Sequence, residues 1–396
     1  MMGERRFLSG NHAVAYAVKY IQPEVIAAYP ITPQSSIVEK IAQFVETREL
    51  DADFIRVESE HAALSACYGA ISAGCRVFTA TSSQGLAYMC EMLPYVSGSR
   101  FPMVMPVVNR SMAAPWTIWG DQQDAISQRD TGWIQLFVEN AQEAFDTCIQ
   151  AYRLSEDPEV MTPVMVNLDG FVLSHTEELV DLPAAEEIQA FLPPYQAPYA
   201  VDFANPTTFC FGATPEIFIE YKFLQQAGMQ AALQKIPQIA AEFEKQFGRS
   251  FGGLIQEYDC ADADYILATM GSFTGTARVV AQKLRAEGKK VGVLKVRSFR
   301  PFPLKEVAKV LRNVKAFGVL DRNYSYGNEG ALYTEIKAAL YDLPQRPPAL
   351  NFIGGLGGRD ISQDEFTAMF RKLEEAHQTP GSVKAVNFVG LRWSNG

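Results

Sequence analysis

Short apolar runs rich in β-branched residues alternate with helix-patterned segments through residues 11–175. Each run ends at or near Gly, Pro or Ser, and this alternation is typical of βαβ units that form a parallel sheet. We expect strands at 24–29, 53–57, 76–81, 102–108, 133–138 and 163–168. The pattern predicts an open α/β sheet, and ligands of such sheets bind at the carboxyl ends of the strands.

The segment 59–73 has helical spacing, and its small residues suit close packing. Alanine recurs along it at positions 62, 63, 66 and 70. We expect this helix to begin near Glu58.

The composition changes between residues 181 and 208, where Pro, Ala and acidic residues accumulate. This composition favours an extended arm over a packed element. A long helical stretch at 215–247 follows the arm.

A second α/β pattern begins at Asp264, with strands expected at 265–270, 290–296, 316–321 and 349–355. Their spacing predicts a compact domain of about 110 residues that ends near residue 375. We therefore divide the chain into a first domain with its arm and helix at 1–235 and a second domain at 258–396. The length of 396 residues agrees, because one hydrophobic core rarely supports so long a chain.

Charge and cysteine content narrow the function classes. A net charge of −10 without a clustered basic face argues against nucleic acid as a partner. The six cysteines include no C-x-x-C pair, so we expect neither a zinc site nor an iron–sulfur motif, and a reducing cytosol fits best. The amino-terminal segment lacks the apolar core of a leader, and no apolar run of about 18 residues occurs. We expect a cytoplasmic protein without a membrane contact.

Three polar side chains follow predicted strands or begin a predicted helix. Thr32, in YPITP at 29–33, stands between two prolines that fix the backbone. Its hydroxyl either contacts a ligand at the sheet edge or caps the helix that starts at Gln34 or Ser35, and these roles do not exclude each other.

The run VESEHAA at 57–63 places two carboxylates at a helix amino terminus. The helix dipole alone explains Glu58. Glu60 lies one turn into the helix beside alanines, where a carboxyl group can be partly shielded from water and share a proton with a ring nitrogen.

Arg110 directly follows the expected strand 102–108, so its guanidinium lies at the same edge and can grip a small carboxylate. A surface ion pair is the alternative. The long aromatic and polar run at 114–133 favours a loop packed over a site or an interface. Its aspartates, at positions 121, 124 and 130, match no metal-binding spacing, and we expect helix capping and no metal.

Two glycine clusters follow strands of the second domain, GSFTG at 271–275 and GGLGGRD at 354–360. Each has a weak resemblance to a phosphate-binding turn. We interpret both as tight turns.

Taken in order, the motifs of the first half resemble domain I of pyruvate:ferredoxin oxidoreductases. They are YPITP, VESEHAA, SSQG at 82–85, VVNR with WGDQQD and QRDTGW between 107 and 133, and LDGF with SH at 168–175. The motifs ATMGSFTGTAR, VLKVRSFRPFP, VLDRNYSYGNEG and GLGGRD resemble domain II of the same family. The resemblance covers nearly the whole chain, and the ordered set is highly specific.

The resemblance implies a pyrimidine domain of the thiamine-diphosphate-binding fold followed by a transketolase C-terminal-like α/β domain. The chain would be the alpha subunit of a hetero-oligomeric oxidoreductase of anaerobic metabolism. That enzyme would convert pyruvate and coenzyme A reversibly to acetyl-CoA and CO₂ with electrons passed to ferredoxin, and its reverse reaction would fix CO₂.

The resemblance also implies that the cofactor site is shared. Thiamine diphosphate would lie between this chain and a beta subunit, because no GDG with a paired Asn about 25 to 30 residues on, the pattern for Mg²⁺ and diphosphate, occurs in this sequence. The Mg²⁺ and the [4Fe–4S] clusters would belong to partner subunits, which include a gamma and a ferredoxin-like delta subunit.

The family's site residues carry over by position. Glu60 would hydrogen-bond N1′ of the aminopyrimidine ring as the catalytic glutamate, while Thr32 and Arg110 would bind the 2-oxoacid. The remaining cofactor contacts would be Tyr29, Pro30, Ile31, Ser83 and Gln84. His61 departs from the hydrophobic or small residue expected beside the glutamate, which concerns the local packing and not the role of Glu60.

The sequence leaves the identity of the substrate open. Thr32 paired with Arg110 fits a small unbranched acid such as pyruvate, whereas a 2-oxoglutarate, branched-chain 2-oxoacid or oxalate oxidoreductase would share both domains. A structural subunit that has lost catalysis is a further alternative.

Overall fold

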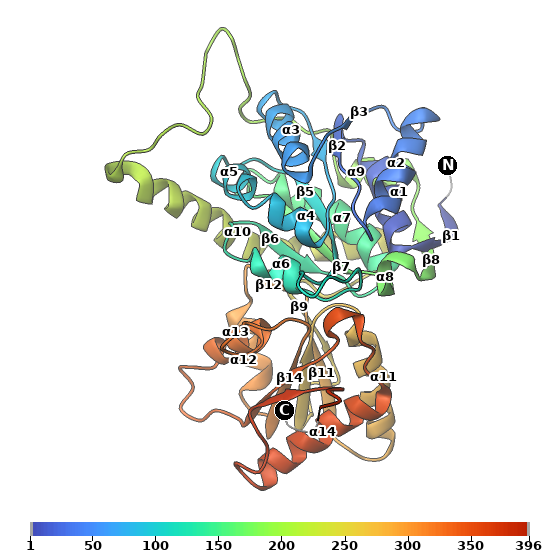
Figure 1. The fold of residues 1–396 in the computed structure, drawn as a ribbon, viewed down its shortest axis with the longest axis vertical. Helices are drawn as coiled ribbons and strands as arrows, with labels where there is room; N and C mark the ends of the chain where they lie inside the picture. The colour runs from blue at the N-terminus through green and yellow to red at the C-terminus, as the bar shows by residue number, and fades with distance from the viewer. Residues whose placement is uncertain (1–2, 394–396) are drawn as a thin grey trace.

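The computed structural model describes residues 3–393, which fold into two stacked α/β domains (Figure 1). The first domain carries the amino terminus and the second lies below it in the figure. The expected α/β class of both halves is confirmed.

Within the described residues, seven strands form the sheet of the first domain in the order β12-β6-β7-β5-β4-β2-β3. Neighbours pair in parallel except at β12, which runs antiparallel to β6. The strands are β2 (Val25–Ala28), β3 (Asp53–Arg56), β4 (Val77–Phe78), β5 (Val104–Asn109), β6 (Ile134–Phe137), β7 (Val164–Asp169) and β12 (Ser298–Arg300). The last strand comes from the second half of the chain and joins the two domains.

Helices cover both faces of this sheet, as apolar strands of a parallel sheet require. They are α1 (Gly10–Ile21), α2 (Ser35–Glu46), α3 (Glu60–Ser72), α4 (Ser83–Tyr88), α5 (Met92–Gly98), α6 (Gln123–Ser127), α7 (Ala141–Ser155), α8 (Val172–His175) and α9 (Ala185–Phe191). A separate antiparallel ribbon pairs β1 (Glu4–Ser9) with β8 (Glu177–Leu182). The core on the α3 side continues into the second domain through Phe137 and Phe299.

The second domain has a six-stranded sheet in the order β15-β14-β13-β10-β11-β9, parallel except at β9. Its strands are β9 (Ile255–Tyr258), β10 (Tyr265–Thr269), β11 (Val291–Val296), β13 (Ala316–Asp321), β14 (Ala349–Ile353) and β15 (Val386–Phe388). The helices are α11 (Phe273–Ala286), α12 (Leu304–Leu311), α13 (Ala331–Ala339), the 3₁₀ turn η1 (Leu356–Gly358) and α14 (Gln363–Gln378). Because β15 pairs with β14, the sheet extends past residue 375, where we expected the domain to end.

The expected long helix is confirmed as α10 (Pro215–Phe247). Its carboxyl-terminal half packs on α7, and its amino-terminal half projects from the molecule beside the extended arm (Figure 1). The arm is shorter than expected, because residues 185–191 form α9 before the chain becomes extended.

The helix expected to begin near Glu58 begins at Glu60 instead. The Ser59 hydroxyl caps it by accepting a hydrogen bond from the Ala62 N–H. Glu58 therefore lies outside the helix.

Buried charges join the two domains. Glu143 of α7 accepts hydrogen bonds from Lys295 Nζ at 2.6 Å and from Arg297 Nε at 3.1 Å, and all three side chains are almost inaccessible to water. Such a pair stabilises one relative placement of the domains, because separating it would leave a buried charge without a partner. Among residues 3–393 no helix combines the length and apolarity that crossing a membrane requires.

Candidate active site

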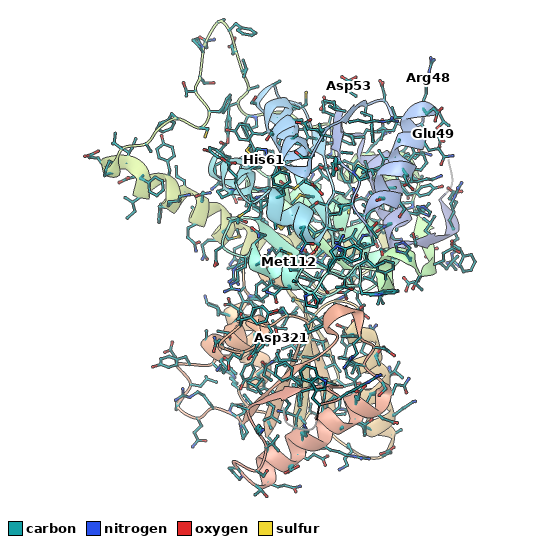
Figure 2. The ribbon with its side chains drawn as sticks, in the orientation of Figure 1. Arg48, Glu49, Asp53, His61, Met112 and Asp321 are labelled. Carbon is teal, nitrogen blue, oxygen red and sulfur yellow. The ribbon has the colours of Figure 1, made fainter. Side chains whose placement is uncertain are left out.

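The sequence-predicted site residues lie at the carboxyl edge of the first sheet. Thr32 follows β2, Arg110 follows β5, Ser83 follows β4, and Glu60 opens α3 after β3. In Figure 2, His61 lies on α3 beside Glu60 in the chain, and Met112 lies at the edge that faces the second domain. Parallel strands bring these loops to one edge, as the sequence predicted.

Arg110 is held by main-chain oxygens on two sides. Its Nη1 donates to the Thr32 oxygen at 2.9 Å, and its Nε donates to the Thr117 oxygen at 3.0 Å. The side chain is buried, and the Trp116 ring lies 5.8 Å from its guanidinium carbon. Burial lowers the pKa of Arg110, and the charge of Asp124 offsets part of that shift.

Among the described residues, Nη2 of Arg110 donates no hydrogen bond. The guanidinium therefore keeps donors for an external anion while its plane is fixed by the protein. A small carboxylate suits such a donor better than a neutral group does, because the hydrogen bond is charge-assisted. The alternative of a surface ion pair is wrong, since the side chain is buried and its guanidinium forms no ion pair within residues 3–393.

Thr32 is exposed at this edge. It does not cap the following helix: α2 has Gln34 at its N-cap position and no side-chain capping bond, so the capping interpretation is wrong. The loop is fixed instead by Asn11, whose Nδ2 donates to the Pro33 oxygen at 2.7 Å. The Thr32 hydroxyl is thereby left free to face a ligand.

Glu60 is a buried carboxylate, 8% exposed, and it accepts no hydrogen bond from any described residue. A Cβ atom at Gly85 would lie 2.7 Å from Glu60 Oε1 and 2.6 Å from Thr81 Oγ1. The absence of a side chain at position 85 thus allows the Glu60 carboxyl group to pack directly against the α4 backbone. The hydroxyls of Thr81 and Ser82 are also buried without a partner among the described residues.

Asp124 organises the site, whereas the sequence predicted for it, as for Asp121 and Asp130, only a helix-capping role. It is 1% exposed, and its Oδ2 accepts the main-chain N–H of Arg110 at 2.9 Å and of Ser83 at 3.0 Å. Its Oδ1 accepts Asn109 Nδ2 at 2.9 Å and the Ala125 N–H at 2.8 Å. Burial raises the pKa of Asp124 to about 6, although the four N–H donors favour its charged form. Asp124 therefore ties the ends of β4 and β5 together.

The other two aspartates of this loop differ from Asp124. Among residues 3–393, Asp130 is exposed and pairs only with Arg129 and Arg300, at 3.8 and 4.0 Å. Asp121, in contrast, is buried and contacts the second domain. Among the described residues no group of three or more His, Cys, Asp or Glu side chains is placed to hold a metal ion.

The expected cofactor contacts lie close to these groups. Ser83 is buried, and its Oγ donates to the Ser111 oxygen at 2.7 Å and lies 2.5 Å from Gln84 Oε1. Tyr29 and Ile31 are half-buried, and Pro30 is exposed. Their role as cofactor contacts stays a prediction.

The two glycine clusters of the second domain contact the first domain. At the amino end of α11, Ser272 donates through N and Oγ to Asp169 Oδ2 at 2.7 and 2.6 Å. The anion at this helix terminus is thus a carboxylate of the same chain. The cluster at 354–358 packs against the loop that follows Arg110. Both are tight turns, as expected, with an interdomain role that the sequence did not reveal.

Two family models match the chain. Residues 16–242 match the model described as pyruvate flavodoxin/ferredoxin oxidoreductase, thiamine diphosphate-binding, and residues 263–366 match pyruvate:ferredoxin oxidoreductase core domain II. The first of these models covers more than half of the chain.

Curated relatives match over almost the full length. The chain is 45% identical over 389 residues to the ketoisovalerate oxidoreductase subunit VorA of Pyrococcus abyssi, with 98% of each chain covered. It is 46% identical over 387 residues to the pyruvate synthase subunit PorA of Methanothermobacter thermautotrophicus, again with 98% of each covered. It is 47% identical to PorA of Methanosarcina barkeri, with 97% of this chain and 96% of that one covered.

Solved structures share the fold. The 2-oxoglutarate:ferredoxin oxidoreductase from Magnetococcus marinus superposes with a TM-score of 0.71 at 21% identity, over 94% of this chain and 65% of that longer chain. A split-gene transketolase superposes with a TM-score of 0.53 at 12% identity, over 94% of this chain and 97% of that one. The predicted fold class, a thiamine-diphosphate-binding domain followed by a transketolase-like α/β domain, is confirmed.

Proposed function

The chain belongs to the pyruvate:ferredoxin oxidoreductase family, and on that premise we propose that it is the alpha subunit of a pyruvate synthase. The enzyme converts pyruvate and coenzyme A to acetyl-CoA and CO₂, and the electrons pass to ferredoxin. The observation that carries the proposal is Arg110, a buried arginine that is held by two main-chain oxygens and keeps Nη2 for an anion.

Arg110 binds the carboxylate of the 2-oxoacid in this proposal. Because Thr32 and Thr117 fix the guanidinium plane, substrate binding requires little further ordering of the side chain. Arg110 contacts the main-chain oxygen of Thr32, and the hydroxyl of the same residue is exposed. In this proposal that hydroxyl donates to the substrate carboxylate or to the neighbouring carbonyl oxygen of the substrate.

The residues around Glu60 fit the aminopyrimidine ring of thiamine diphosphate. The carboxyl group is buried and unpartnered among the described residues, and Gly85, which has no side chain, lets it pack closely against α4. When bound, thiamine diphosphate supplies the nucleophilic carbon and the electron sink for decarboxylation. Glu60 holds a proton at the ring nitrogen N1′, and Tyr29, Pro30, Ile31, Ser83 and Gln84 surround the cofactor.

We assign the rest of the site to partner subunits. A beta subunit supplies Mg²⁺ and the diphosphate contacts, while gamma and ferredoxin-like delta subunits complete the enzyme and the [4Fe–4S] clusters carry electrons. The assignment is supported by the relatives, which are named as subunits, and by the six cysteines of this sequence, which include no C-x-x-C pair.

The alternative substrate with specific support is a branched-chain 2-oxoacid, because a ketoisovalerate oxidoreductase subunit is 45% identical to this chain. Reduction of ferredoxin or viologen by the assembled enzyme, with coenzyme A present, separates the candidates. We expect kcat/KM for pyruvate to exceed that for 3-methyl-2-oxobutanoate, 2-oxoglutarate and oxalate by about tenfold or more.

Preference for another of these acids would reassign the substrate. A complex that is loaded with thiamine diphosphate and iron yet turns over none of them would identify the chain as a structural subunit.

A further inference from the structure

The loop that follows Arg110 connects the substrate arginine to the second domain. We call residues 111–122 the substrate loop. Its Thr117 oxygen accepts the Arg110 Nε–H at 3.0 Å, and its Trp116 ring lies 5.8 Å from the guanidinium carbon. The position of Arg110 therefore depends on the conformation of this loop.

The far end of the substrate loop is bound by the second domain through main-chain hydrogen bonds. The Gly358 N–H donates to the Gly120 oxygen at 2.7 Å, and the Gly357 N–H donates to Asp121 Oδ2 at 3.1 Å. The same Asp121 oxygen accepts the Ser111 hydroxyl at 2.6 Å, which closes the loop on itself next to Arg110. One buried carboxylate thus joins both ends of the loop to the glycine turn of the second domain.

Arg322 adds a second connection. Its Nη2 donates to the Gly120 oxygen at 3.1 Å, and its main-chain oxygen accepts the Gln122 N–H at 2.9 Å. The guanidinium is itself fixed, because Asp169 Oδ1 lies 2.9 Å from Nη1 and the Phe273 ring lies 4.4 Å from its carbon atom. Arg322 is 2% exposed, so water does not compete for these contacts.

The glycine turn approaches the loop more closely than any side chain would permit. Gly358 has a φ of +73°, and a Cβ atom there would lie 2.7 Å from Trp119 Cβ. Gly357 has a φ of +59°, but a Cβ atom there would meet nothing within 4 Å. The two neighbouring glycines thus differ in whether a methyl group would push on the substrate loop.

We propose that the second domain is a positioning element for substrate binding: its turn at Gly357 and Gly358, together with Arg322, sets the substrate loop and through it Arg110. The proposal rests on the proposed function, in which Arg110 binds the 2-oxoacid carboxylate. It gives the second domain a role in catalysis beyond packing between the domains. The shared Asp121 carboxylate supports it, since this group accepts hydrogen bonds both from Ser111 next to Arg110 and from Gly357 of the turn.

The first test compares Gly358→Ala with Gly357→Ala in the assembled enzyme. Both place an alanine at positive φ, which is unfavourable for an L-residue, so both share the backbone cost. Only Gly358→Ala presses on Trp119. We expect the KM for pyruvate to rise about tenfold in Gly358→Ala, with kcat within about twofold. It should rise much less in Gly357→Ala, which keeps the N–H bound to Asp121 and adds a methyl group that meets nothing within 4 Å.

Hydrogen–deuterium exchange of the peptide 111–122 measures the loop without reference to turnover. We expect faster exchange in Gly358→Ala than in Gly357→Ala. Equal exchange and equal KM in the two variants would overturn the proposal. It would also be overturned if Gly358→Ala exchanges faster in the loop without any change in KM, while Arg110→Lys does raise the KM. If Arg110→Lys also leaves KM unchanged, the assignment of Arg110 to the substrate fails instead.

The second test uses matched buried cations at the domain interface. Arg322→Met removes the ion pair with Asp169, and Lys295→Met removes those with Glu139 and Glu143. Each carboxylate keeps another donor: Ser272 for Asp169, Arg278 for Glu139 and Arg297 for Glu143. Both variants should unfold at lower temperature, but only Arg322→Met should raise the KM for pyruvate. An equal rise in both would show that domain packing in general, and not the substrate loop, affects the site.

Discussion

The guanidinium of Arg110 donates through Nη1 to the main-chain oxygen of Thr32 at 2.9 Å. The two residues belong to loops after different strands, β5 and β2, and they are 78 positions apart. Because the oxygen of Thr32 holds Arg110, the Thr32 side chain remains available at the same edge. One hydrogen bond therefore places the two proposed substrate-binding groups side by side.

Arg110→Lys should raise the KM for pyruvate and lower kcat/KM by about 10- to 100-fold. A lysine ammonium group cannot bind the main-chain oxygens of Thr32 and Thr117 and also present a fixed donor to a carboxylate. Steady-state kinetics of the assembled enzyme measures both constants. Arg100→Lys is the matched control: Arg100 is likewise bound to main-chain oxygens, among them Met161 at 3.1 Å, but lies outside the site. The two variants behaving alike would refute a specific role for Arg110.

Gly85→Ala should weaken binding of thiamine diphosphate about tenfold or more, because the added methyl would lie 2.7 Å from Glu60 Oε1 and displace the carboxyl group. The measurement is the cofactor concentration that half-activates the cofactor-free complex. Gly69→Ala in α3 is the control, since a Cβ atom there meets nothing within 4 Å. Half-activation at the same concentration in both variants would contradict a role for the Glu60 carboxyl group in cofactor binding.

Asp124 predicts a pH dependence. Its pKa is about 6, so above pH 6 its carboxylate accepts the N–H groups of Ser83 and Arg110, and below pH 6 a proton occupies one of the accepting positions. We expect the KM for pyruvate to rise as the pH falls below about 6. In Asp124→Asn the KM should be raised at all pH values, and the rise of KM below pH 6 should disappear. If the rise of KM below pH 6 persists unchanged in the variant, the titrating group is not Asp124.

The effect of Asp124 on stability has the opposite sign. A raised pKa in the folded state means that the protonated form is favoured on folding, so this residue contributes stability that is present at low pH and is lost as the pH rises through about 6. Weaker substrate binding in acid would therefore not reflect unfolding caused by Asp124.

Local patterns predicted the scaffold well, for reasons that the structure makes clear. Helix α10 spans Pro215–Phe247 as expected, because Pro215 occupies its first turn and Gly248 ends it with a φ of +70°. The ten expected strands lie within a few residues of observed ones, since each is an apolar run bounded by turn residues. The sequence did not predict β1, β8, β9, β12 or β15. The expected start of α3 was near Glu58, because Glu58 and Glu60 both suit a helix amino terminus, but the observed N-cap residue is Ser59.

The supporting contacts of the site were beyond reach of the sequence. Asp124 contacts Ser83 across 41 positions, and Gly357 contacts Asp121 across 236 positions. No local spacing separates Asp124 from the exposed Asp130 in the same loop. Family resemblance identified the residues that would touch ligands, but which polar residues support them depends on how the two domains pack.

The last prediction concerns a buried carboxylate of the second domain, labelled in Figure 2. Asp321 ends β13 and accepts four N–H groups: those of Leu332 at 2.8 Å and Tyr333 at 3.2 Å, and the amides of Asn323 at 3.2 Å and Asn351 at 2.8 Å. It thereby caps the amino terminus of α13. Burial raises the pKa of Asp321 to about 7.

Asp321→Asn should lower the free energy of unfolding by about 1–3 kcal/mol, because an amide NH₂ replaces one acceptor and faces donors. The wild-type carboxyl has a folded pKa of about 7 against 3.8 unfolded, so its stabilising contribution is full in acid and is lost as the pH rises through 7. The cost of the substitution should therefore shrink by roughly 1 kcal/mol between pH 6 and pH 8. Urea unfolding at both pH values measures this, with Asp342→Asn on the exposed surface as the control. A cost that is the same at pH 6 and pH 8 would mean that Asp321 is already charged in the folded protein at pH 6, held so by its four donors.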